Sequence, residues 1–185
     1  MLIFSSNQVF AEDGTEATVE IEEIIVKASW RETKLEKADA SIFVIGQEVL
    51  IDQPVKHFEQ LTQMIPNLNW AGGSSRPRYF QIRGIGERSG YEGTPNSSVG
   101  FIIDDIDFSG LGGIATTFDL EQVEVHRGPQ GLRMGANALA GLIYMQSKNP
   151  TDVFEGIAEL VYGSDDIKSL GIAMGGPINE EEKLK

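Results

Sequence analysis

Alternating apolar and polar positions mark the strands of this chain. In the segment 122–127, Val123 and Val125 fall on one face while Glu124 and His126 fall on the other, which is the period of a half-buried strand. Four further short runs also have strand character, at 40–45, 79–83, 100–104 and 142–145. The pattern therefore predicts several short strands spread along the chain.

One stretch has helical spacing instead. Its apolar positions recur on a single helical face at Val55, Phe58, Leu61 and Ile65. Asp52 is suited to cap the N-terminus, Pro54 is tolerated in a first turn, and Pro66 ends the pattern. The sequence therefore predicts a helix that begins at Asp52 and ends near Ile65.

Glycine-rich and polar stretches separate these elements. We expect loops at 70–75, 84–96 and 107–117, and a turn at Asp104 and Asp105. Aspartate tolerates the positive φ that such a turn requires at Asp105.

The last part of the chain alternates with a two-residue period. Apolar side chains recur on one face of the pattern, and a turn-forming sequence, Gly-Ser-Asp-Asp, begins at Gly163; the apolar positions are Phe154, Ala158, Leu160 and Tyr162, and then Leu170, Ile172 and Met174. This pattern predicts a β-hairpin with one apolar face. It is also the period of transmembrane β-strands, which face lipid on alternate positions.

Composition narrows the classes of function. The 185-residue chain carries a net charge of −13, which argues against nucleic acid, because phosphate binding needs a basic surface. The chain has no cysteine, which excludes a thiolate metal site. Its two histidines, His57 and His126, are far apart in the sequence, which argues against a histidine metal site. No apolar run approaches the length of a transmembrane helix.

The stretch from Asp119 to Pro150 carries a family resemblance. It contains a strand that Arg127-Gly128-Pro129-Gln130-Gly131 terminates, because proline lacks an N–H, and then regularly spaced small residues. The matching positions are Val123-Glu124-Val125, Arg127 to Gly131, Gly135, Ala138, Gly141 and Lys148-Asn149-Pro150, with Ile82-Arg83-Gly84 further upstream. This set resembles the signature of the plug domain of TonB-dependent outer-membrane receptors.

The resemblance implies an α+β fold. We expect a plug domain at 39–150, with a small mixed β-sheet and short helices, and the first β-hairpin of a truncated transmembrane β-barrel at 151–185. The implied protein is a receptor of the cell outer membrane that imports a scarce ligand, such as a ferric siderophore, with energy transmitted by TonB. The chain by itself would be periplasmic. No enzymatic activity, cofactor or metal is implied.

The N-terminal region is expected to recruit TonB. Residues 1–11 resemble the remnant of a signal peptide, and 12–38 are expected to be a disordered segment. Within it, the β-prone run Glu23, Ile24, Ile25, Val26, Lys27 and Ala28 resembles a TonB box, a strand held free for pairing with TonB. The alternative is an edge strand of the following domain.

Six further residues are assigned roles from the resemblance. Arg83, Glu124 and Arg127 are expected to pair with charged residues of the barrel wall, because enclosed charges need partners. Tyr79, Arg88 and Tyr91 are candidate ligand contacts, since a cation and aromatic rings suit an anionic, ring-bearing chelate. The loops 85–98 and 108–117 are expected to face outwards around the ligand.

Other readings have weaker support. Gly84 to Gly90 resembles a dinucleotide fingerprint, but its spacing is one residue too long and no helix follows. The run from Asp105 resembles the start of a calcium-binding loop, but its twelfth position is Thr116. A free plug that binds TonB or ligand in the periplasm, without transport, is the alternative function.

Overall fold

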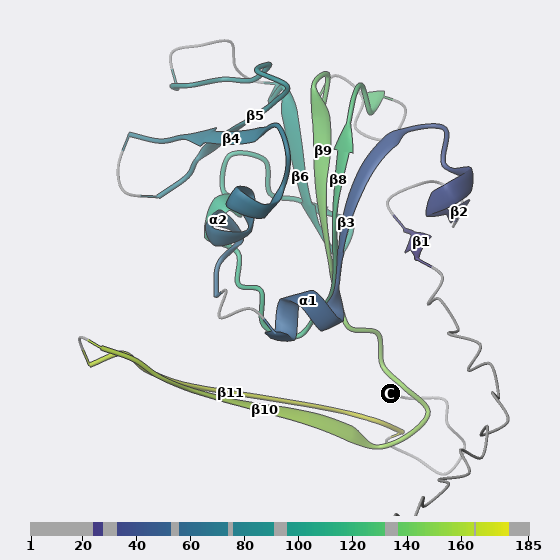
Figure 1. Cartoon of the computed structure of the whole chain (residues 1–185), viewed down its shortest axis with the longest axis vertical. Coiled ribbons are helices and arrows are strands. Elements are labelled where there is room, and N and C mark those ends of the chain that lie inside the picture. Colours follow the sequence, from purple (N-terminus) through teal and green to yellow (C-terminus); the bar gives the residue numbers. More distant parts are fainter. Residues whose placement is uncertain are drawn as a thin grey trace, which may run out of the picture.

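The computed structural model describes residues 24–27, 33–52, 56–73, 76–90, 96–131, 137–164 and 166–177. Figure 1 shows two parts: a domain built around a sheet with short helices, and a long hairpin of β10 and β11 that extends across one end of it. The expected α+β architecture, a small mixed sheet with short helices, is confirmed.

A five-stranded mixed sheet forms the centre of the domain. Its strand order is β3-β8-β9-β6-β7; β6 and β9 run parallel and the other neighbouring pairs are antiparallel. The strands are β3 (Ser41–Gly46), β8 (Leu120–Arg127), β9 (Gly141–Ser147), β6 (Val99–Ile103) and β7 (Ile106–Asp107). Four of the predicted strands are therefore confirmed in this sheet, those at 40–45, 100–104, 122–127 and 142–145.

A second, two-stranded sheet joins β4 (Leu68–Ala71) to β5 (Tyr79–Ile82). The predicted strand at 79–83 is confirmed, but the loop predicted for 70–75 is wrong at Trp70 and Ala71. The sequence of β4 has no clear alternation of its own. Its strand conformation comes from pairing with β5, in the register Leu68 with Ile82.

The helices are shorter than predicted. Asp52 is the last residue of α1 (Gln47–Asp52), not the cap of the next helix, and α2 (Phe58–Leu61) continues as the 3-10 turn η2 (Thr62–Met64). The Gln60 side chain explains the late start of α2: its Oε1 accepts hydrogen bonds from the amides of Lys56, at 2.7 Å, and His57, at 3.2 Å. The other 3-10 turns are η1 (Leu35–Lys37) and η3 (Gly112–Ile114).

Three phenyl rings lie at the centre of the main core. Phe58 of α2 meets Phe80 of β5 at 5.4 Å and Phe101 of β6 at 5.0 Å between ring centroids, both edge to face. This cluster packs on the apolar face of the main sheet, to which β8 contributes Val123 and Val125. The core therefore ties α2 and the small sheet to the main sheet.

The turn between β6 and β7 is built from two aspartates. Asp104 and Asp105 have φ values of 46° and 67°, so the expected positive φ at Asp105 is confirmed and extends to Asp104. Asp104 also accepts hydrogen bonds from the Ser147 amide, at 2.8 Å, and hydroxyl, at 2.6 Å. The side chain thus fastens the turn to the end of β9.

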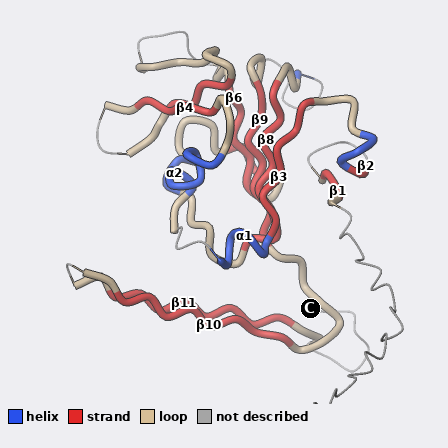
Figure 2. Tube along the Cα trace, in the orientation of Figure 1, coloured by secondary structure: helices blue, strands red, loops and turns tan. Residues whose placement is uncertain are grey.

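The hairpin predicted near the end of the chain is confirmed. β10 (Glu155–Tyr162) and β11 (Lys168–Gly175) pair in register from Glu155 with Gly175 to Tyr162 with Lys168 (Figure 2). The exposed face carries large apolar side chains at Phe154, Leu160, Tyr162, Leu170, Ile172 and Met174. The other face approaches the domain, where Gly171 lies against the ring of Phe118.

In the part of the chain that the structure describes, none of the helices has the length and apolar content needed to cross a membrane.

Candidate functional site

The candidate site is the place where the N-terminal segment docks on the main sheet. β1 (Ile25–Val26) pairs with β2 (Thr33–Lys34), and the carbonyl of Ile24 accepts a hydrogen bond from the amide of Leu35 at 3.0 Å. The side chain of Val26 is fully buried, whereas Ile24 and Ile25 remain partly exposed. One side chain therefore anchors the segment.

Two side chains of β8 bind the backbone of this segment. Gln122 donates from Nε2 to the carbonyl oxygen of Ile25 at 3.1 Å, and Glu124 accepts at Oε1 from the amide of Lys27 at 2.6 Å. Both contacts join positions 97 residues apart in the sequence. The docking therefore depends on tertiary structure and not on local preference.

A row of polar side chains on β8 makes these contacts possible. Gln122, Glu124 and His126 alternate along the strand and are all buried, with Glu124 at 0% and His126 at 2% exposure. Within the row, Gln122 Nε2 donates to Glu124 Oε1 at 2.6 Å, and His126 Nε2 donates to Glu124 Oε2 at 2.7 Å. A buried carboxylate requires such partners, because desolvation of an unpaired charge is costly.

A β-bulge supplies a further contact at the rim of the site. The pairing of β8 with β9 skips a position between Leu120 and Gln122, so Glu121 has no cross-strand partner. A bulge redirects the side chain that it contains. Glu121 forms an ion pair with Lys27 and accepts a hydrogen bond from Asn149 Nδ2 at 3.1 Å. The charged end of the segment is thereby held outside the buried row.

The expected TonB box coincides with this docked segment. The structure describes Ile24, Ile25, Val26 and Lys27, whereas Glu23 and Ala28 lie outside the described residues. The expectation of a strand held free is wrong for the described part, since both of its edges are hydrogen-bonded. Disorder throughout 12–38 is likewise contradicted by β1, β2 and η1.

Sequence reasoning identified Glu124 but not its neighbours in the site. Gln122 was assigned no role, and His126 was placed only on the polar face of a strand. The sequence carries no signal of their burial, because alternating polar residues are also typical of a strand with one solvated face.

The three residues expected at a barrel wall have different surroundings. Glu124 has partners within the chain, so the expectation that its partners come from a barrel is contradicted by its contacts with Lys27, Gln122 and His126. Arg83 is exposed, with a positive φ of 54°. Arg127 is half-buried, and its Nε atom is buried without a hydrogen-bond partner among the described residues. A wall contact thus stays a prediction for the two arginines.

The candidate ligand contacts are described only in part. Tyr79 is half-buried with the Arg78 guanidinium 5.7 Å from its ring centroid, and Arg88 is exposed; Tyr91 lies outside the described residues. The loop 108–117 packs partly on the domain, and its expected orientation towards the outside stays a prediction. Gly112 and Gly113 are buried against Phe101 and Pro77, and the amide of Thr117 donates to the carbonyl of Lys56 at 3.1 Å.

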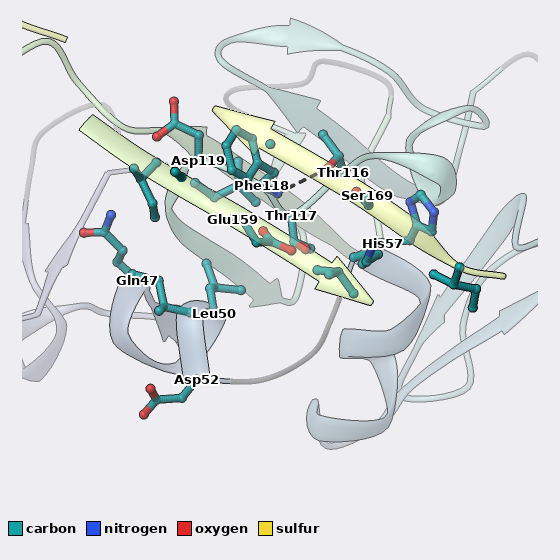
Figure 3. A pocket seen from close by; sticks show the side chains of 18 of the residues that line it. Gln47, Leu50, Asp52, His57, Thr116, Thr117, Phe118, Asp119, Glu159 and Ser169 are labelled. Carbon is teal, nitrogen blue, oxygen red and sulfur yellow. Dashed lines mark hydrogen bonds between the residues drawn. The ribbon is translucent and has the colours of Figure 1, made fainter. Parts of the chain in front are cut away.

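A cavity of about 900 Å³ lies between the hairpin and the domain (Figure 3). Its labelled walls come from α1, the segment 116–119 and the two strands of the hairpin, and they include Leu50, Phe118 and Glu159. Tyr79 and Arg88 do not line it. Among the described residues, no group of three or more histidine, aspartate or glutamate side chains is arranged to hold a metal ion.

Comparison with known proteins gives one family. Residues 34–142, more than half of the chain, match the model of the TonB-dependent receptor plug domain. This match begins five residues before the domain boundary expected at 39 and ends eight residues before the one expected at 150.

Two curated relatives extend the similarity beyond the family match. The ferric enterobactin receptor PirA of Pseudomonas aeruginosa is 24% identical over 91% of this chain and 25% of its own length. The pesticin receptor of Yersinia pestis is 25% identical over 85% of this chain and 23% of its own length. The chain therefore spans about a quarter of the length of these relatives.

A solved structure agrees with the fold. The outer-membrane ferripyoverdine receptor of Pseudomonas aeruginosa, bound to ferripyoverdine, aligns with a TM-score of 0.71 and 22% identity. The alignment covers 85% of this chain and 21% of that receptor.

Proposed function

We propose that this chain, which belongs to the family of TonB-dependent receptor plug domains, is the plug portion of an outer-membrane importer. The members of this family are transport receptors and not enzymes. The receptor takes up a scarce ligand, with an iron–siderophore complex as the expected cargo, and TonB supplies the energy. The observation that carries this proposal is the position of β1, an extended segment ahead of the matched domain that docks by hydrogen bonds and one buried valine.

The ligand class rests on the relatives. Two of them are named for ferric siderophores, ferric enterobactin and ferripyoverdine. A shorter match, 34% identical over 68 residues, is to a vitamin B12 transporter of Vibrio vulnificus, so members of the family differ in cargo. A ferric siderophore is therefore our proposal for this chain, with Tyr79, Arg88 and Tyr91 as its contacts on the plug.

The two arginines support enclosure of the domain by a wall. Arg127 buries its Nε without a described partner, and a buried guanidinium atom that lacks a hydrogen bond is destabilising. Arg83 projects from a strained turn that the Asn67 carbonyl holds through the Arg83 amide, at 2.9 Å. We propose that carboxylates of a surrounding barrel pair with both side chains.

The hairpin supports a location in the outer membrane for the whole receptor. Its outer face is apolar at alternate positions, including Leu160, Leu170 and Ile172, which suits contact with lipid. Its inner face contacts the domain through Gly171 and Phe118. We propose that β10 and β11 are the first strands of the barrel.

Binding to TonB tests the function. Ile25→Pro removes a backbone amide from β1, whereas Ile25→Val keeps the amide and the β-branched side chain. We expect the chain and the Ile25→Val variant to bind the purified periplasmic domain of TonB in calorimetry, and Ile25→Pro to lose binding. Equal binding by the proline and valine variants would contradict the assignment of residues 23–28 as the TonB box.

A further inference from the structure

The two edges of β1 have separate partners. In an extended strand, the N–H and C=O groups of one residue point to the same side, and those of the next residue point to the opposite side. The carbonyl of Ile24 bonds to Leu35 beside β2, so even-numbered residues of the segment face β2. The carbonyl of Ile25 and the amide of Lys27 face the opposite edge, towards β8.

Side chains take the place of a neighbouring strand on that second edge. A paired strand would offer an N–H to the Ile25 carbonyl and a C=O to the Lys27 amide. Here the Gln122 amide group provides the donor and the Glu124 carboxylate provides the acceptor, at 3.1 Å and 2.6 Å. The two side chains come from alternate positions of β8, so they project from the same face of the sheet.

We infer that Gln122, Glu124 and His126 form a peptide-backbone binding site that mimics a β-strand and blocks the pairing edge of the segment 24–27. With β2 on one edge and this site on the other, β1 offers no edge to which a strand of another protein could add. The inference rests on the proposed function in one respect, that this segment is the part which recruits TonB.

Contacts within β8 hold the side chains of the site in place. His126 holds Glu124 Oε2 at 2.7 Å, and Gln122 contacts Glu124 Oε1 at 2.6 Å, so the carboxylate has a fixed orientation in which Oε1 faces Lys27. A site whose side chains are already fixed loses little conformational entropy on binding. His126 is thus a positioning residue, because it acts on the segment through Glu124.

Partner affinity should depend on how often the segment leaves this site. When the binding-competent state is only a fraction of the population, the apparent dissociation constant rises by the inverse of that fraction. Weakening the Gln122 contact should therefore strengthen TonB binding without any change in the segment itself.

Thiol reactivity can measure docking without any partner. The chain has no cysteine, so Val26→Cys introduces a single thiol at a fully buried position. Gln122→Met keeps the length of the side chain but removes the donor to the Ile25 carbonyl and, with it, the donor to Glu124 Oε1. We expect Gln122→Met to raise the rate at which the Val26→Cys thiol reacts with a maleimide about tenfold, the effect of losing one buried hydrogen bond.

Two controls keep the result specific. Ile24→Cys, at a position that is 46% exposed, should react at the same rate with either residue at position 122. Gln63→Met changes an exposed glutamine of η2 and should leave the Val26→Cys rate unchanged. Circular dichroism and the unfolding midpoint identify any variant whose sheet is lost. Gln122→Leu, which also removes the donor and adds no charge beside Glu124, then provides the second test.

The possible outcomes distinguish a failure of the strand-mimic site from a failure of the proposed function in TonB-dependent transport. An unchanged Val26→Cys rate in a folded Gln122 variant would overturn the strand-mimic site, whatever the result with TonB. A faster rate without any TonB binding by the released segment would leave the site intact and contradict the proposed function. A faster rate together with about tenfold tighter TonB binding is the result that we expect.

Discussion

His126 and Glu124 lie two residues apart on one face of β8, and a 2.7 Å hydrogen bond joins His126 Nε2 to Glu124 Oε2. Both side chains are buried, yet neither belongs to the apolar core. Their position beneath residues 24–27 links the sheet to the segment that is proposed to recruit TonB.

Replacing His126 should loosen this segment. His126→Leu would leave Glu124 Oε2 buried without that donor, which costs about 1–3 kcal/mol. We expect faster hydrogen exchange at the Lys27 amide, which bonds to the same carboxylate. His126→Gln restores a donor and should recover part of the protection. Equal exchange in the leucine and glutamine variants would show that the imidazole does not position Glu124.

The ion pair between Lys27 and Glu121 should contribute much less. The side chain of Lys27 is 17% exposed and that of Glu121 is 32% exposed. Partly solvated ion pairs contribute about 0–1 kcal/mol to stability. Glu121→Gln should therefore change the Lys27 exchange rate by about fivefold at most at low salt, and the difference should disappear in about 1 M salt, where screening is strong. A larger, salt-independent change would assign Glu121 to the buried row instead.

The phenyl cluster should dominate the stability of the domain. Phe58 is fully buried and meets two other rings, so Phe58→Ala should lower the free energy of unfolding by about 3–5 kcal/mol. Phe154→Ala is the matched control, because Phe154 is 77% exposed on the hairpin. Urea unfolding followed by circular dichroism measures both. Similar midpoints for the two variants would place the core elsewhere.

Gly141 should not tolerate a methyl group. A Cβ at this position would lie 2.3 Å from the backbone oxygen of His126 and 2.6 Å from Ile82 Cδ1. Gly141→Ala should therefore destabilise the chain by about 1–3 kcal/mol through overpacking. Gly46→Ala meets nothing within 4 Å and serves as the control in the same urea titration. Full stability of Gly141→Ala would mean that β8 and β9 can separate at no cost.

The secondary structure was predicted best where apolar and polar residues alternate along a strand. β8 and the β10–β11 hairpin were found because one face of each strand is apolar and the other is not. β4 was missed because Leu68 to Ala71 has no alternation, and its conformation depends on β5. The helix start was misplaced because the favourable cap at Asp52 was overridden by the contact of Gln60 with the Lys56 amide.

Individual residues of the candidate site were predicted from the sequence, but the contact that brings them together was not. The segment 23–28 and Glu124 were each recognised from family motifs, but their contact was not, since it joins residues 97 positions apart. The roles of Gln122 and His126 depend entirely on that contact. Local patterns cannot indicate which segment covers a polar strand face, because any extended peptide presents the same backbone groups.

The central place of β8 also predicts an order of folding. β8 and β9 are close in the sequence, whereas the polar row of β8 and the segment 24–27 that it binds are 97 positions apart. Contacts this distant in sequence form late, since the chain must first close a long loop. We therefore expect the sheet to form before the segment docks, so that the undocked state which a partner would select is also a state through which the chain passes as it folds.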